Sequence, residues 1–153
     1  MLEHHEHDLA TSELKLMRYD RMYMDIAKRI GEMSHAERTK VGAVLVKDTN
    51  ILSFGFNGTP TGFDNDCEDF FYGNMVTKPE VLHAESNAIA KVAMSTQSSE
   101  GSTLYVTLSP CVECAKMIIQ AGLSRVVYKE KYRDDSGMEL LARARLEVEQ
   151  LYE

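Results

Sequence analysis

Two short motifs in the sequence carry side chains that bind metal ions. Cys111 and Cys114 lie three residues apart, so both thiols face the same side of a helix that begins near them. The N-terminus of a helix stabilises the thiolate form of cysteine, which is the form that binds zinc. The second motif, His83-Ala84-Glu85, adds an imidazole and a carboxylate at the predicted start of another helix. Zinc prefers four ligands, so two thiolates and one imidazole predict a zinc site with one open position.

Glu85 is predicted to act beside the metal rather than to bind it. It follows His83 by two positions, which is too close for both side chains to bind one tetrahedral ion comfortably. Two thiolates and one neutral imidazole cancel the charge of a zinc ion, so a water molecule in the open position needs a nearby base. We therefore expect Glu85 to accept a proton from that water and to pass it to a leaving group.

Two other interpretations of the cysteines remain open. Cys67 could complete a closed structural zinc site of three cysteines and one histidine, although Glu85 would then have no role. A Cys-x-x-Cys pair at a helix start is also the arrangement of dithiol redox sites, but His83 would then explain little. The coincidence of His83 and Glu85 with the cysteine pair favours the open zinc site.

Composition and charge exclude several classes of protein. The chain has 153 residues, is 44% hydrophobic and carries a formal net charge of −7, which predicts one domain over residues 1–153 and disfavours a nucleic-acid partner. No apolar run approaches the ~18 residues that a membrane helix needs, and the N-terminus lacks the pattern of a signal peptide. The cysteines are too few and odd in number for a disulfide framework. We expect a cytoplasmic protein without a membrane partner.

Hydrophobic periodicity predicts the elements that position the motifs. We expect helices over residues 11–34, 84–95, 111–121 and 137–143, and strands over residues 41–46, 51–56, 103–108 and 125–129. Residues 1–11 are expected to form a flexible arm, residues 57–82 a functional loop or one that hides short structure, and residues 146–150 a helical extension or a final strand. The first two strands form an antiparallel hairpin, and the later ones alternate with helices as in parallel crossovers. The predicted fold class is therefore α/β, a three-layer α/β/α sandwich with a mixed sheet of about five strands.

The first predicted helix has an apolar face that should pack on the sheet. The members of this face are spaced by three and four residues: Tyr19, Met22, Tyr23, Ile26, Ile30 and Met33. Met17 and Met24 fall outside the face, and we expect them to be exposed or to belong to a subunit contact.

The motifs and the segments around them resemble a known family. The pattern His-x-Glu followed by Pro-Cys-x-x-Cys is typical of zinc-dependent nucleobase deaminases. Segments 41–46, 55–60, 83–89 and 105–116 resemble, in order, the conserved blocks of the cytidine deaminase superfamily, and within it those of the deoxycytidylate (dCMP) deaminases. The resemblance implies a fold of cytidine deaminase type and the hydrolysis of dCMP to dUMP and ammonia. It also implies that His83, Cys111 and Cys114 bind Zn²⁺, while Glu85 carries protons as water attacks C4 of cytosine.

The resemblance further implies a set of substrate-binding residues. Asn57 corresponds to a residue that hydrogen-bonds the sugar, although Asn-Gly is also a common turn pair. Arg38 matches a position that binds phosphate in some members, and its alternative role is a solvated surface charge. Tyr132 resembles a loop aromatic that covers the base, and Ala84 and Ser109 are placed beside the substrate by their positions in the motifs.

The family resemblance also carries a prediction about regulation. Many dCMP deaminases are hexamers that dCTP activates and dTTP inhibits, with Mg²⁺ bound to the triphosphate. By this resemblance we expect a homo-oligomer, a hexamer, whose effector site is formed by Gly55, Asn57, Gly58, Asp64 and Asp66.

Two alternative functions compete with this prediction. One is a related zinc deaminase that acts on another cytosine nucleoside or nucleotide, or on a base in a polynucleotide, and the net charge of −7 argues against the polynucleotide. The other is a structural zinc module without catalysis, and the open fourth metal position argues against it.

Overall fold

The computed structural model describes the backbone of residues 2–152 and the side chains of residues 11–152. Its helices are α1 (Leu2–Gly31), α2 (Ala84–Ala93), α3 (Val112–Gln120) and α4 (Ser136–Arg143). Its strands are β1 (Gly42–Lys47), β2 (Asn50–Phe56), β3 (Glu68–Phe71), β4 (Asn74–Thr77), β5 (Thr103–Leu108), β6 (Arg125–Glu130) and β7 (Glu147–Gln150). Among the helices that the structure describes, none has the length and apolar character needed to cross a membrane.

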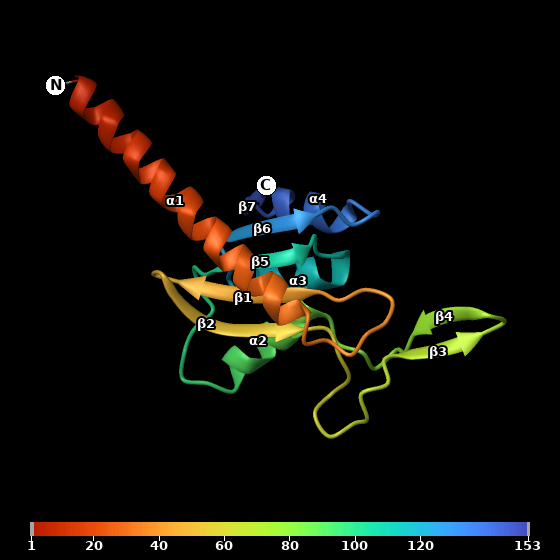
Figure 1. The fold of residues 1–153 in the computed structure, drawn as a ribbon. Coiled ribbons are helices and arrows are strands. Elements are labelled where there is room, and N and C mark those ends of the chain that lie inside the picture. The colour runs from red at the N-terminus through yellow and green to blue at the C-terminus, as the bar shows by residue number, and fades with distance from the viewer. Residues whose placement is uncertain (1, 153) are drawn as a thin grey trace.

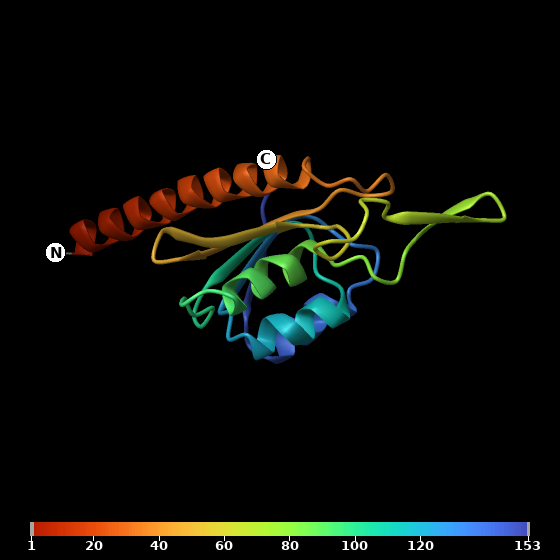
Figure 2. The same ribbon diagram turned by 90° about the horizontal axis from the view of Figure 1, so that it is seen from below.

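A mixed five-stranded sheet forms the centre of the fold, with strand order β2-β1-β5-β6-β7. Strand β1 pairs antiparallel with both β2 and β5, whereas β6 pairs parallel with β5 and with β7. Figure 2 shows α1 on one face of the sheet and α2, α3 and α4 on the other face. The predicted α/β sandwich with three layers and a mixed sheet is confirmed.

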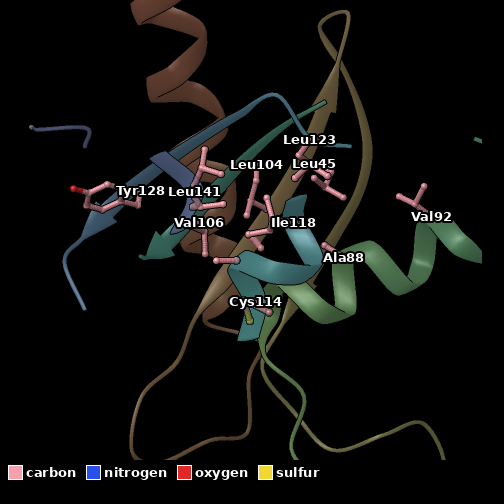
Figure 3. Close-up of a cluster of buried hydrophobic side chains, with 14 residues drawn as sticks. Leu45, Ala88, Val92, Leu104, Val106, Cys114, Ile118, Leu123, Tyr128 and Leu141 are labelled. Carbon is pink, nitrogen blue, oxygen red and sulfur yellow. The ribbon is translucent and has the colours of Figure 1, made fainter. Parts of the chain in front are cut away.

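Each face of the sheet buries its own set of apolar side chains. The larger cluster lies between the sheet and helices α2, α3 and α4, where Leu45, Leu104, Val106, Ile118 and Leu141 are fully buried. Figure 3 shows this cluster, with Cys114 of α3 at its edge. The predicted metal ligand Cys114 is therefore itself part of this buried cluster. The packing of α3 against the sheet thus also fixes the position of the ligand.

The smaller cluster joins α1 to the sheet and corrects the predicted helix face. Tyr23, Met24 and Ala27 are buried against it, whereas Met22 and Met33 are 43% and 55% exposed. Met17 is exposed, as expected, but the prediction that Met24 lies outside the packing face is wrong. Gly42 of β1 lets the helix approach closely, because a side chain there would collide with the backbone of Ala27 and Gly31. This contact places Met24 in the buried stripe.

Helix α1 begins earlier than expected. Its backbone is helical from Leu2, which differs from the flexible arm predicted for residues 1–11. No glycine or proline occurs between Leu2 and Gly31, and the segment is rich in good helix formers such as Leu, Glu and Ala. Figure 1 shows that the N-terminal half of α1 extends beyond the sheet.

Short structure occupies the predicted long loop and the ambiguous C-terminal segment. Strands β3 and β4 pair antiparallel as a separate two-stranded hairpin within residues 57–82. Figure 1 shows this hairpin projecting away from the main sheet. The last segment forms strand β7 at the edge of the sheet, which decides between the two alternatives of a helix and a strand.

A buried ionic cluster connects α1 to the sheet. Both Asp20, in α1, and Arg125, in β6, are almost fully buried, and the guanidinium group donates a hydrogen bond of 2.8 Å to each carboxylate oxygen. The hydroxyl of Tyr105 donates to the same carboxylate at 2.6 Å, and Glu149 accepts a further bond from Arg125 at 2.8 Å. Burial raises the pKa of Tyr105, so its hydroxyl keeps its proton and remains a donor.

We predict that Asp20→Ala lowers the free energy of unfolding by about 3 kcal/mol, because it leaves the buried guanidinium of Arg125 with a single well-placed partner. The exposed Asp25 on the same helix is the matched control, and Asp25→Ala should change that free energy by less than about 0.5 kcal/mol. Urea unfolding followed by circular dichroism measures both values. Equal effects of the two substitutions would contradict the role of the cluster.

Candidate active site and metal centre

The two sequence motifs meet at one end of the sheet. A cavity of about 500 Å³ opens there, where β5 ends at Leu108 and β6 ends at Glu130. Ligands commonly bind at the carboxyl ends of parallel strands, because the following helices begin there. The cavity is lined by His83, Glu85 and Cys111, so it contains residues of both predicted motifs.

Three predicted metal ligands converge from two helix starts. His83 is the residue immediately before α2, Cys111 is the residue immediately before α3, and Cys114 lies in the first turn of α3. Nδ1 of His83 lies 3.2 Å from Sγ of Cys114 and 3.5 Å from Sγ of Cys111. All three ligand atoms lie within 4.8 Å of one another.

The ligand atoms of this group fit a zinc ion. Tetrahedral zinc with a sulfur at about 2.3 Å and a nitrogen at about 2.0 Å separates the two ligand atoms by about 3.5 Å. Both nitrogen-to-sulfur distances lie near that value. Two thiolates and an imidazole are also the donor types that zinc selects. His83, Cys111 and Cys114 would therefore hold the ion.

Cys67 does not supply a fourth ligand to the metal site. Among the described residues, the group of clustered ligand atoms contains only His83, Cys111 and Cys114. Cys67 is buried next to the β3–β4 hairpin, where its thiol lies 3.7 Å from the carbonyl oxygen of Asn65. This placement argues against the closed structural site.

The cysteine pair has the electrostatics of a metal site. Hydrogen bonds from Cys114 and His83 hold the pKa of the Cys111 thiol far below its ordinary value. A hydrogen bond with Cys111 and burial raise the pKa of Cys114. A hydrogen bond with Cys111 also raises the pKa of His83. Metal binding to thiols releases protons, so a dication at this point would hold both sulfurs as thiolates.

Glu85 stands beside the ligands without belonging to them. Its side chain is 4% exposed and lines the cavity. Burial raises the pKa of its carboxyl group above the ordinary value, and the neighbouring His83 and Cys114 offset only part of this rise. A carboxylate with a raised pKa can both accept and return a proton near neutral pH, which is the property of a general acid and base.

Two glycines let helices α2 and α4 lie close to neighbouring backbone at the site. A side chain at Gly55 would collide with the backbone of Ala84 and Ala88, so glycine at this position lets α2 lie close to β2. A side chain at Gly137 would collide with the carbonyl oxygen of Pro110 and the backbone of Cys111. The start of α4 therefore presses directly on a metal ligand.

The structure brings all five predicted substrate-binding residues to the cavity. They are Arg38, Asn57, Ala84, Ser109 and Tyr132. The side chain of Asn57 also holds the chain before β1, because it accepts from the N–H of Val41 at 2.8 Å and donates to the carbonyl of Thr39 at 2.7 Å. Each of its two polar groups keeps capacity for one more hydrogen bond to a ligand. The hydroxyl of Ser109 accepts from the N–H of Tyr132 at 2.7 Å, which fixes the following loop.

The other predicted effector residues have local structural contacts and do not line this cavity. Gly55 is buried under α2, and Gly58 pairs with Leu82, the residue before His83. Asp64 closes a turn by accepting from the N–H of Asp66 at 3.0 Å. The carboxylate of Asp66 lies 3.4 Å from Nζ of Lys78.

Five polar residues of the cavity were missed at the level of sequence: Thr39, Glu68, Thr77, Lys131 and Arg133. Lys131 and Arg133 flank Tyr132, and this alternation of cations around an aromatic could have indicated them. Glu68 and Thr77 come from the β3–β4 hairpin, and nothing in their local sequence points to a site.

Comparisons with known proteins agree with the geometry. Residues 17–130 match the family described as the cytidine and deoxycytidylate deaminase zinc-binding region. The chain therefore belongs to this family. A structure of dCMP deaminase from the cyanophage S-TIM5, in complex with dCMP and dUMP, is 45% identical in sequence with a TM-score of 0.81, and the match covers 86% of this chain and 95% of that one.

Curated relatives include cellular and viral enzymes. The deoxycytidylate deaminase of Enterobacteria phage T2 is 33% identical over 148 residues, with coverage of 71% of this chain and 78% of its own length. The deoxycytidylate deaminase of Homo sapiens is 37% identical over 118 residues, with coverage of 73% and 65%. The relatives thus share the greater part of the described fold.

We predict that Cys67→Ser leaves the zinc content of the purified protein at one ion per chain, because Cys67 does not reach the ligand group. Cys114→Ser should lose most of the zinc, since it removes one of the three side-chain ligands that His83, Cys111 and Cys114 supply. Atomic emission spectroscopy after gel filtration measures both. Loss of zinc from Cys67→Ser would restore the closed structural site.

Proposed function

We propose that the protein is a zinc-dependent deaminase that hydrolyses dCMP to dUMP and ammonia. The observation that carries this proposal is the arrangement of His83, Cys111 and Cys114 within 4.8 Å, with the buried carboxyl of Glu85 in the same cavity. The 45% identity to a dCMP deaminase that binds dCMP and dUMP supports the choice of substrate.

The residues of the cavity supply the proton transfers of this reaction. When bound, zinc acts as a Lewis acid that lowers the pKa of a water molecule. The Glu85 carboxylate accepts a proton from the attacking water and delivers it to N3 of cytosine. It then carries a proton to the amino group at C4, so the C4–N bond breaks as the C4 carbonyl forms and ammonia leaves. Burial of Glu85 excludes bulk water from these transfers.

Cations around the cavity favour a substrate with a phosphate group. Arg38, Lys131 and Arg133 all line it, although the whole chain is acidic. A guanidinium group binds phosphate oxygens in a bidentate manner. Tyr132 stands between the last two cations, with the Arg133 guanidinium 5.8 Å from its ring centre, and it can cover a bound base. This set supports a nucleotide over a free nucleoside.

We predict that Glu85→Ala keeps its zinc and its unfolding midpoint but loses about 10²-fold or more in turnover of dCMP, because the general acid and base is removed. The loss of cytosine absorbance measures turnover. The same assay with deoxycytidine, dCTP and single-stranded DNA decides among the alternative substrates, and wild-type protein should prefer dCMP. Full activity of Glu85→Ala would refute the assigned role, and wild-type preference for single-stranded DNA would favour the polynucleotide function.

We also propose that the chain assembles as a homo-oligomer, a hexamer like that of many dCMP deaminases. The β3–β4 hairpin supports this, because Phe70, Phe71 and Tyr72 are 70%, 56% and 103% exposed. Isolated two-stranded hairpins are marginally stable in water, and exposed aromatic clusters of this kind mark contact surfaces. A second copy of the chain is the proposed occupant.

Regulation and location complete the proposal. We propose that dCTP and dTTP act as effectors with Mg²⁺, at a site built from Gly55, Asn57 and Gly58 and the acidic turn of Asp64 and Asp66. The exposed carboxylates of that turn support a cation site of this kind. The reduced thiols of the metal group fit a reducing compartment such as the cytoplasm.

We predict that light scattering after gel filtration gives a mass several times the 17.3 kDa of one chain. Substitution of Phe70 and Phe71 by serine should lower that mass, because it removes apolar contact area. The matched control is Met94→Ser, which changes an 83% exposed side chain outside the hairpin. A wild-type protein of monomeric mass would contradict the assembly.

A further inference from the structure

Glu68 is a buried acidic residue of the cavity that the proposed chemistry does not use. It begins β3 and is 7% exposed, and with Glu85 it is one of two acidic residues among the described lining residues. A buried carboxylate is costly unless hydrogen bonds stabilise it. Its partners therefore indicate its role.

Glu68 holds the backbone of the segment that carries Arg38. Its Oε1 atom accepts the N–H of Glu37 at 2.9 Å and the N–H of Arg38 at 3.3 Å. The segment between α1 and β1 has no helix or strand of its own. Its position therefore depends on such contacts and on those that Asn57 makes with residues 39 and 41.

Thr77 holds the side chain of the same arginine. Nη1 of Arg38 donates a hydrogen bond of 3.0 Å to Oγ1 of Thr77. Thr77 is the cross-strand partner of Glu68 in the β3–β4 hairpin. One pair of facing residues thus holds both the backbone and the guanidinium group of Arg38, and all three line the cavity.

We propose that the Glu68–Thr77 pair positions Arg38 to bind the phosphate group of the nucleotide, so that the hairpin sets the affinity for a monophosphate. The inference rests on the proposed function, because it requires a phosphorylated substrate. Arg38 is exposed, and without the pair its long side chain would have to be ordered when the ligand binds. The negative charge of Glu68 would repel a phosphate group. Glu68 therefore acts through its hydrogen bonds to the backbone of residues 37 and 38 and not by contact with the substrate.

The experiment compares steady-state kinetics of zinc-loaded variants with dCMP and with deoxycytidine, which has the same base and no phosphate. Glu68→Ala should raise KM for dCMP about tenfold and leave kcat within about twofold, because only ordering of the phosphate contact is lost. Its kinetics with deoxycytidine should stay unchanged. Glu68→Gln keeps an acceptor oxygen and should restore most of the affinity. The matched control is Asp69→Ala, an exposed neighbour on β3.

A double-mutant cycle tests whether Glu68 acts through Arg38. In an Arg38→Ala background, Glu68→Ala should add no further rise in KM for dCMP. If Glu68→Ala does not fold, as judged by its unfolding transition and zinc content, Thr77→Val replaces it. Thr77→Val should show a smaller rise in KM that also vanishes in the Arg38→Ala background.

The outcomes separate this inference from the proposed function. An unchanged KM in Glu68→Ala, an additive effect in the cycle or an equal loss with both substrates would overturn the inference while the function stands. A wild-type enzyme that does not turn over dCMP would refute the proposed function and the inference together.

Discussion

The structure depends on the meeting of two helix N-termini at one metal-binding point. His83 precedes α2, Cys111 precedes α3, and their ligand atoms come within 4.8 Å only if both helices start at the same end of the sheet. Parallel pairing of β5 with β6 fixes the start of α3, and the close contact of Gly55 with α2 fixes the start of the other helix. The positive ends of both helix dipoles then favour thiolates at this point.

The rest of the fold keeps this end of the sheet in place. The buried bond between Asp20 and Arg125 fastens α1 to β6, and Gly137 brings α4 against Cys111. The segment after α1 is then bound by Asn57 on one side and by Glu68 on the other. The segment that follows α1 therefore contributes the part of the cavity wall around Arg38, although α1 lies on the face of the sheet opposite to the metal ligands (Figure 2). Packing on both faces of the sheet thereby shapes the cavity.

The metal ligands and the sheet could be predicted because their signals are local. Cys111, Cys114 and His83 lie at short spacings beside helix starts, β1 is apolar up to Val46, and β5 is apolar at its centre. The contacts of Glu68 could not be predicted, because they join residues 30 and 31 positions apart and no local pattern records them. The prediction for Met24 was wrong because a long helix offers adjacent apolar stripes, and only the close contact of the helix backbone at Ala27 with Gly42 of β1 selects between them.

X-ray absorption at the zinc edge measures directly whether the fourth position of the metal is open. Two sulfur ligands at about 2.3 Å and two lighter ligands at about 2.0 Å are expected, one from the imidazole and one from water. Three sulfur ligands with a single lighter ligand would mean that a fourth side chain closes the site, and would contradict the open position.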